Sequence, residues 1–179
     1  MSQIPMWMQP TYDPNAVQPM RDELIAVGFD ELLTPEDVDT AIHQKDDKTV
    51  LVMINSVCGC AAGSARPGVC EALQHAVIPD RLTTVFAGQD KAAVAHLRET
   101  YLNMAPPSSP AIALFKNGEP IVMLHRHNIE GHSYEEIAQV LKQIFDEYCT
   151  AEGPSITPEQ YAEVQHARSC GSKIPRFNS

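Results

Sequence analysis

An uninterrupted apolar run at residues 50–54 (VLVMI) stands out in the pattern of hydrophobic and polar positions. Continuous, partly β-branched runs of this length are typical of strands buried on both faces of a sheet. The run ends at Asn55 and Ser56, and the small residues at 61–65 (AAGSA) suit the tightly packed first turns of a helix. The pattern therefore predicts a central strand that leads almost directly into a helix.

The rest of the chain shows helical and strand patterns in turn. Val17, Met20, Leu24 and Val27 recur at helical spacing, and Gly28 is typical of a helix end. Before the central strand we expect a short strand at 29–33 and a helix from Thr34 to about Gln44. After it we expect a helix that continues to Val77 with a kink at Pro67, a strand at 82–87 and a helix from Asp90 to Tyr101. The last predicted elements are strands at 111–115 and 120–124, a helix from the capping box of Ser133 and Glu136 to Tyr148, and a short helix starting at Thr157.

The order of these elements indicates the fold class. Strands that are joined through helices run parallel, whereas Asn117-Gly118 between two apolar runs is a strong hairpin signal. The sequence predicts an α/β fold: a mixed central sheet with an antiparallel hairpin at its edge and helices on both faces. We expect one domain over residues 1–149 and a C-terminal extension over residues 150–179 that contains a short helix.

The composition and charge of the chain limit which classes of partner and which cellular compartment are expected. The chain has 179 residues and a formal net charge of −10, which disfavours nucleic acid and anionic membrane surfaces as partners. The first residues lack the basic region and apolar core of a signal peptide, and no apolar run approaches the ~18 residues of a membrane span. We expect a cytoplasmic protein. Five cysteines in such a chain indicate catalysis or metal binding rather than a disulfide scaffold.

Two of these cysteines, in Cys58-Gly59-Cys60, lie between the central strand and its helix. The N-terminus of a helix stabilises a thiolate and can lower a cysteine pKa from about 8.5 to between roughly 3.5 and 7.5. Residues i and i+2 of a helix point apart, so we expect Cys58 to precede the helix and Gly59 to adopt unusual backbone angles. A disulfide over so short a loop is strained and reducible, which favours redox chemistry over a pair of structural cysteines or half of a metal site.

The other three cysteines carry weaker signals. Cys70 lies near the apolar face of its helix and is expected to be a packed small hydrophobe. Cys149, at a helix end, and Cys170, in the polar tail, are both candidates for solvent-accessible free thiols, with a regulatory or mutual disulfide as the lesser alternative. A metal site of Cys58, Cys60, Cys70 and His75 is disfavoured, because structural zinc sites space paired cysteines by two to four residues.

Three histidines follow the hairpin. His125 and His127 are expected to share one face of its second strand, with His132 in the next loop. They are interpreted as polar residues at a strand end, with a metal cluster as the alternative.

Several motifs together resemble the bacilliredoxin family, over roughly residues 15–149. They are NSVCGCAAGSARPG at 55–68, FAGQD at 86–90, PPSSP at 106–110 and RHNIEGH at 126–132. In addition, PAIALFKNGEPIVML at 110–124 resembles the thioredoxin hairpin, whose leading proline is cis and faces the active-site sulfurs. The resemblance implies a thioredoxin-like fold with Pro110 in the cis form.

The resemblance also implies an activity. Bacilliredoxins are thiol–disulfide oxidoreductases that remove bacillithiol from mixed disulfides with protein cysteines, and some have weak disulfide-isomerase activity. By this resemblance Cys58 is the attacking thiol and Cys60 the resolving thiol. Bacillithiol is then a co-substrate, the partners are S-thiolated client proteins, and no cofactor or metal is expected. Cys70 and the tail beyond Cys149 depart from the family pattern.

A substrate site and two rival functions complete the expectations. In a thioredoxin-like fold the loop after the hairpin lies near the proline and the cysteines. Arg126, His127 and His132 are therefore candidates for shaping a site for a small acidic thiol. The rival interpretations are a protein disulfide isomerase or reductase, and a non-enzymatic metal-binding module that uses the same cysteines. The sequence leaves the oligomeric state open.

Overall fold

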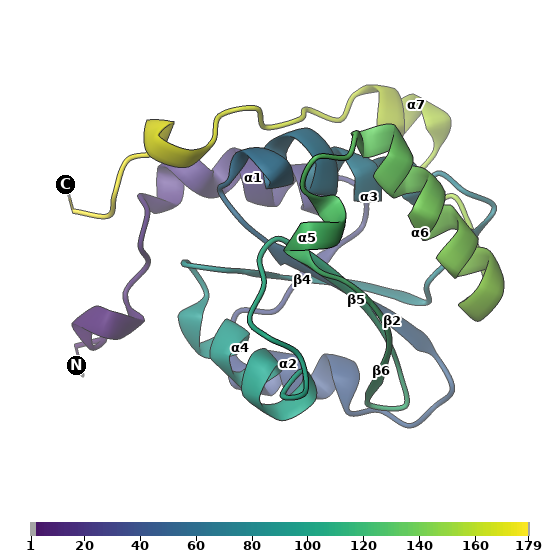
Figure 1. Cartoon of the computed structure of the whole chain (residues 1–179), viewed down its shortest axis with the longest axis horizontal. Helices are drawn as coiled ribbons and strands as arrows, with labels where there is room; N and C mark the ends of the chain where they lie inside the picture. The colour runs from purple at the N-terminus through teal and green to yellow at the C-terminus, as the bar shows by residue number, and fades with distance from the viewer. Residues whose placement is uncertain (1–2, 179) are drawn as a thin grey trace.

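A five-stranded mixed sheet forms the centre of the computed structural model, which describes residues 3–178 (Figure 1). Its strands lie in the order β1 (Asp30–Glu31), β4 (Arg81–Phe86), β2 (Thr49–Asn55), β5 (Ala111–Lys116) and β6 (Glu119–Leu124). The first three strands are parallel, and β5 runs antiparallel to both β2 and β6. All seven residues of the central strand β2 are buried, as its apolar sequence predicts.

Helices cover both faces of this sheet (Figure 1). Leu51 and Met53 of β2 share a buried cluster with residues of α1 (Pro14–Ile25), α3 (Arg66–Ala72) and α6 (Tyr134–Tyr148). The alternate residues of the strand pack on the opposite side, with α2 (Pro35–Ile42) and α4 (Lys91–His96). This alternation follows from the two-residue period of a strand. The thioredoxin-like fold expected from the sequence is confirmed.

Local signals place most element ends where the sequence predicts them. Capping boxes at Thr34 and Ser133 start α2 and α6. Asn117 and Gly118 both adopt positive φ, at 54° and 82°, in the turn between β5 and β6. Such a turn matches the twist of a two-residue hairpin. The Ser109–Pro110 bond is cis, which confirms that expectation.

The segment after the cysteines differs from the single long helix that the sequence predicts. A π-helical segment η2 (Ala61–Ala65) precedes α3, and Pro67 occupies the first turn of α3. That helix ends at Ala72, and β3 (Val77–Ile78) pairs with β7 (Ala151–Glu152) in a second, two-stranded sheet. Val77 was therefore wrongly placed on a helix, because its strand partner lies more than 70 residues away.

Three shorter elements complete the chain before the tail. They are η1 (Met6–Met8), the π-helical η3 (Leu97–Tyr101) after α4, and α5 (Arg126–Ile129) after β6. Because β6 ends at Leu124, His125 and His127 do not lie on a strand, and that expectation is wrong. Within residues 3–178, no helix combines the length and the apolar character that crossing a bilayer requires.

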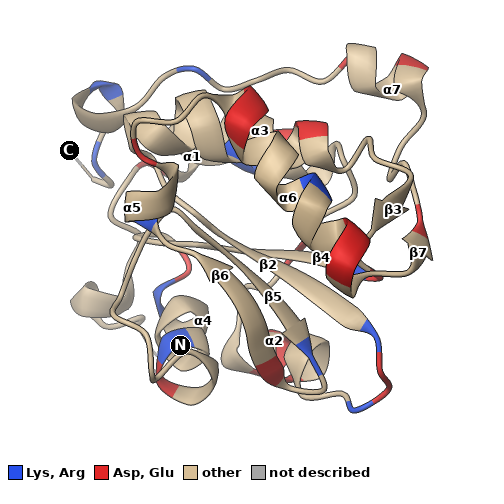
Figure 2. Ribbon diagram, turned by 45° about the vertical axis from the view of Figure 1, so that its right-hand side comes forward, with Lys and Arg blue, Asp and Glu red and all other residues tan. Residues whose placement is uncertain are grey.

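The C-terminal extension packs along the domain. After β7 it forms α7 (Pro158–Ala162) and η4 (Gly171–Lys173), and both views show it running over α1 and α3 (Figures 1 and 2). Tyr161 and Val164 of the tail are partly buried against the main core. Further on, Ile174 is buried with Val17 and Met20 of α1. The division at residue 149 stays a prediction about domain organisation.

Candidate active site

The segment that leads from β2 into the helix positions the two motif cysteines. Asn55, the last residue of β2, accepts a hydrogen bond at its side-chain oxygen from the Ser56 backbone N–H (2.9 Å). The Cys58 N–H in turn donates to Ser56 Oγ (3.4 Å), and the Cys58 carbonyl accepts from the backbone of Ala61 (3.1 Å). Cys58 therefore lies just before the helix and Cys60 in its first turn, as the sequence predicts.

The two sulfur atoms of the motif differ in acidity. They are free thiols, 2.8 Å apart and hydrogen-bonded, and both residues are partly exposed. Burial is the largest single effect and raises the pKa of Cys58, whereas hydrogen bonds with Cys60 and Ser56 lower it. The Ala61 N–H and the charge of Arg126 also lower it, and the resulting pKa lies below its ordinary value.

The pKa of Cys60 moves in the opposite direction, to about 11. Its burial is the largest cause, and the hydrogen bond with Cys58 and the charge on Cys58 add to it. When one of the two thiols ionises, the negative charge therefore forms on Cys58 and the proton stays on Cys60. A thiolate held next to a protonated thiol is the arrangement that attacks disulfides.

Gly59 plays a different part from the one expected. Its backbone is helical and its φ lies outside the left-handed region, so the prediction of unusual backbone angles is wrong for this dithiol state. Cys58 lies outside the helix, and the bend occurs there instead. A Cβ atom on Gly59 would lie 3.8 Å from the sulfur of Cys170, so the missing side chain leaves room for the tail to approach the motif.

Pro110 lies at the same end of the sheet as the cysteines. Ala111, the residue after it, pairs with Ile54 in the antiparallel register of β5 and β2. The buried Pro110 is therefore level with Asn55, where β2 ends. The strand register alone brings the proline to the edge from which the cysteines project.

Arg126 is the residue after the hairpin that acts on the sulfurs. Its backbone N–H donates to Ser108 Oγ (2.7 Å), which ties the start of α5 to the loop before Pro110. The charges of Cys60 and Cys58 raise the pKa of Arg126, and Arg126 in turn favours the thiolate on Cys58. Figure 2 shows the basic residue at the start of α5.

The two histidines proposed with Arg126 lie differently. The His127 ring stacks on His125, with centroids 5.4 Å apart, and His127 is exposed. His132 pairs with Glu136 (3.4 Å), and its carbonyl accepts a hydrogen bond from Ser64 Oγ (2.6 Å) in the helix that follows the cysteines. The loop therefore contacts η2, the helical segment that follows Cys60, through His132, whereas His127 faces solvent.

The remaining cysteines separate into buried and accessible thiols. Cys70 is fully buried, as predicted, and burial raises its pKa. Cys149 is also buried, at 6% exposure, and burial raises its pKa to about 11, so the expectation of an accessible thiol is wrong there. Its burial results from the turn of the chain after α6, which brings β7 back onto the domain. Cys170 is partly exposed, and all five thiols are free.

The metal site considered for Cys58, Cys60, Cys70 and His75 is not assembled. His75 Nε2 pairs with Asp146 (2.7 Å), and the Cys70 sulfur faces the Glu23 carbonyl (3.8 Å). In the part of the chain that the structure describes, the potential ligand atoms that do gather within 4.8 Å belong to Glu23, Cys70 and His166. Arg66 forms a buried ion pair with this same Glu23, and its positive charge opposes a cation at that position.

Arg66 is a residue of the site that sequence reasoning missed. Its guanidinium donates to Asn55 Oδ1 (3.1 Å) and to the Ser56 carbonyl (2.8 Å), the two residues that lead to the cysteines. Its Nε donates to Glu23 (2.8 Å) in α1. The only signal was its place in the motif that follows the cysteines, where a buried arginine cannot be told from a surface one.

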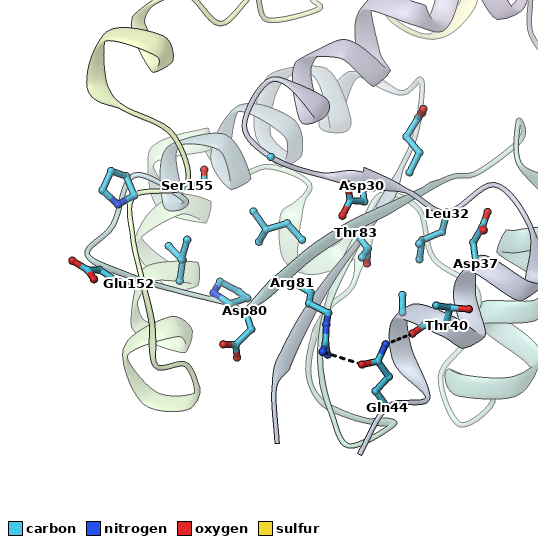
Figure 3. A pocket seen from close by; sticks show the side chains of 17 residues that line it. Asp30, Leu32, Asp37, Thr40, Gln44, Asp80, Arg81, Thr83, Glu152 and Ser155 are labelled. Atoms are coloured by element: carbon cyan, nitrogen blue, oxygen red, sulfur yellow. Dashed lines mark hydrogen bonds between the residues drawn. The ribbon is translucent and has the colours of Figure 1, made fainter. Parts of the chain in front are cut away.

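A separate cavity of about 590 Å³ lies between β1, β4 and α2 (Figure 3). Its wall carries acidic side chains, among them Asp30, Asp37 and Asp80, and Gln44 bonds to Arg81 across it (3.0 Å). None of the 17 described residues that line it is a cysteine or a histidine. It therefore supplies neither a thiol nor an imidazole.

Comparison with known proteins places the chain in a family. The family model described as "Disulphide isomerase" matches residues 12–149. A bacilliredoxin of Salinibacter ruber is 44% identical over 94% of this chain and 98% of its own length, and one of Geobacillus kaustophilus is 51% identical over 78% and 94%. An oxidised thioredoxin from Plasmodium falciparum aligns with a TM-score of 0.45 and 17% identity, over 69% of this chain and all of its own. From the family model and these relatives, the chain belongs to the bacilliredoxin family and is a thiol–disulfide oxidoreductase.

Proposed function

We propose that this protein removes bacillithiol, or a similar small thiol, from mixed disulfides on protein cysteines. The observation that carries the proposal is the paired dithiol, in which Cys60 donates a hydrogen bond over 2.8 Å to a Cys58 sulfur with a lowered pKa. The relatives from Salinibacter ruber and Geobacillus kaustophilus are both named bacilliredoxins, which supports the choice of small thiol. The reaction suits a reducing compartment such as the cytoplasm.

The first step is thiol–disulfide exchange. The Cys58 thiolate attacks the sulfur of the small thiol in the mixed disulfide, and a bond forms between Cys58 and that sulfur. The bond to the client cysteine breaks, and the client leaves as a thiolate that takes up a proton. The partners of this step are S-thiolated client proteins, and the enzyme is left carrying the small thiol on Cys58.

The second step removes the small thiol from Cys58. While Cys58 is a thiolate, its charge and hydrogen bond help to hold the pKa of Cys60 at about 11. Both effects end once Cys58 is in a disulfide, whereas the charge of Arg126 remains and favours a thiolate on Cys60. Cys60 can then attack Cys58 and release the small thiol. Alternatively, a second molecule of the free small thiol attacks the sulfur of the bound one, which forms a disulfide between the two small thiols and releases Cys58 as a thiolate.

Residues of the adjacent loops are proposed to receive the small thiol. Arg126 is the cation whose charge reaches both sulfurs, so it is proposed to hold an acidic group of the thiol. His127 and His132 are proposed to border the same site from α5 and the loop after it. Pro110 and Gly59 are proposed as supporting residues that leave the sulfur atoms of Cys58 and Cys60 accessible to the substrate.

Disulfide isomerisation or general protein-disulfide reduction is the second candidate. The family model that matches this chain is described as a disulphide isomerase, and the same Cys58 chemistry would serve it. The metal-binding alternative loses support because Cys70 and His75 face other partners.

Purified protein and a client with one cysteine in a mixed disulfide test the proposal. The client is prepared with bacillithiol, with glutathione or with coenzyme A, and loss of each adduct is followed by intact mass. We expect fastest removal of bacillithiol, loss of activity in Cys58→Ser, and unchanged activity in the Cys149→Ala control. Equal rates on all three adducts, together with faster turnover of a scrambled disulfide protein, would favour the isomerase candidate instead.

A further inference from the structure

Cys170, in the C-terminal extension, places a third sulfur beside the Cys-Gly-Cys motif. Its Sγ lies 3.8 Å from the position that a Cβ atom on Gly59 would take. Of the three cysteines outside the motif, Cys70 and Cys149 are buried and Cys170 is partly exposed. Cys170 is thus both accessible and close to the redox site.

Two anchors hold Cys170 in this place. On one side the Ala167 carbonyl accepts a hydrogen bond from the buried Arg66 (3.0 Å). On the other side the Gly171 N–H donates to the Val57 carbonyl (2.8 Å). Only three residues separate Ala167 from Gly171, so the tail cannot carry the sulfur far while both anchors persist.

The second anchor sets Cys170 next to Cys58 in particular. Cys58 follows Val57 and Cys170 precedes Gly171, so the two cysteines flank one backbone hydrogen bond. Standard backbone dimensions then limit their Cα atoms to a separation of at most about 8 Å. Disulfides join Cα atoms about 4.4–6.8 Å apart, so a bond needs only a small shift of the tail.

A cavity of about 590 Å³ opens beside this sulfur. Gly59 and Gly63 of the redox helix form part of its wall, and Arg168 and Cys170 form part of the tail side. The space allows the Cys170 side chain to turn. Arg168 adds a positively charged side chain to the same wall.

We propose that Cys170 is a second resolving thiol, which forms a disulfide with Cys58 and releases the small thiol bound there. The proposal rests on the proposed function of Cys58 as the residue that receives the small thiol. The Cys170 thiolate attacks the Cys58 sulfur, a Cys58–Cys170 bond forms, and the bond between Cys58 and the small thiol breaks. The small thiol leaves as a thiolate and takes up a proton, so no external oxidant or reductant is needed.

This route avoids the short ring that Cys60 must close. A disulfide between Cys58 and Cys60 spans a single residue, and strained disulfides are readily reduced again. A bond to Cys170 joins segments that already touch through Gly171 and Val57. The Cys58–Cys170 disulfide is thus the form in which the oxidised enzyme persists until an external thiol or a reductase reduces it.

Disulfide mapping of a Cys60→Ser variant tests the pairing without any small thiol. The reduced variant is treated with one equivalent of diamide, quenched with acid and digested without reduction. We expect the Cys58 peptide joined to the Cys170 peptide within one chain. The double variant Cys60→Ser/Cys170→Ser should not form an internal bond, and the matched control Cys60→Ser/Cys149→Ala should form it as before. Absence of the Cys58–Cys170 peptide in Cys60→Ser would overturn the proposal.

A release assay tests the chemistry. Cys58 of the same variants is charged with glutathione from its disulfide, free reagent is removed, and released glutathione is measured over time. We expect release about tenfold or more faster in Cys60→Ser than in Cys60→Ser/Cys170→Ser, independent of protein concentration. Equal rates would refute the resolving role. If the Cys58–Cys170 bond and the release of glutathione are observed but the protein does not remove bacillithiol from the client, the proposed function is wrong. The role of Cys170 as a resolving thiol is then still supported.

Discussion

Arg66 and Glu23 form an ion pair with a 2.8 Å separation, and both side chains are completely buried. The pair joins α1 to the start of α3, and Arg66 extends the connection to Ser56 and the tail residue Ala167. The segment that carries Cys58 and Cys60 and the segment that carries Cys170 are therefore both hydrogen-bonded to the buried guanidinium of Arg66. The position of the candidate site depends on this network rather than on the sheet alone.

Removing one partner of this pair should lower the stability of the protein. Glu23→Gln leaves the buried Arg66 charge without a counter-ion, and breaking such pairs costs about 3–5 kcal/mol. We expect a loss of that size in the free energy of unfolding, measured with urea. The exposed Glu163→Gln is the control and should change stability by no more than about 0.5 kcal/mol. A comparably small effect of Glu23→Gln would show that the pair contributes little.

The lowered pKa of Cys58 gives its reactivity a testable pH dependence. Because the thiolate is the nucleophile, alkylation of Cys58 by iodoacetamide should reach its plateau at a lower pH than that of an ordinary cysteine. Cys60→Ala removes the hydrogen bond to the Cys58 sulfur, so the midpoint should move to higher pH. Labelling is read from the Cys58 peptide between about pH 5 and about pH 10. An unmoved midpoint would mean that Cys60 does not stabilise the thiolate.

Arg126 should affect the same midpoint through its charge. Arg126→Ala should raise the pKa of Cys58, whereas Arg126→Lys should largely preserve it. We expect a smaller change than in Cys60→Ala, because the side chain of Arg126 is 46% exposed and solvent weakens its effect. The difference between parent and Arg126→Ala should shrink at high salt. His127→Ala serves as control, and a shift as large in that variant would point to the loop's conformation instead of the charge.

Replacing Gly63 of η2 and Gly68 of α3 by alanine should change the stability of the protein in opposite directions. A Cβ on Gly68 would lie 2.9 Å from Ile137 Cβ in α6, whereas one on Gly63 would meet no atom within 4 Å. Gly68→Ala should therefore destabilise the protein by roughly 1–3 kcal/mol through overpacking. Gly63→Ala should stabilise it by about 0.5–1 kcal/mol, since alanine is the better helix former. Thermal unfolding of the reduced proteins measures both, and a destabilised Gly63→Ala would contradict the open space at that position.

Much of the fold could be predicted because its signals are local. The apolar run of β2, the Asn117-Gly118 turn and the capping residue Ser133 each fix the backbone within a few residues. The position of Cys58 before a helix has the same origin, and it made the pair with Cys60 a redox candidate. The family motifs added two expectations that local physics does not contain, namely the small thiol as substrate and the division of roles between the two cysteines.

Other features arise only where distant segments meet. The burial of Cys149, the β3–β7 pair and the partnership of Arg66 with Glu23 depend on contacts between residues far apart in the chain. The pattern of a single sequence records which residues are apolar or charged, but not the distances between them. The sequence by itself determined the sheet, its hairpin and a thiol pair at a helix start. The tertiary structure alone decided that Gly59 makes room for Cys170, because the tail is held there by hydrogen bonds and burial that no local pattern encodes.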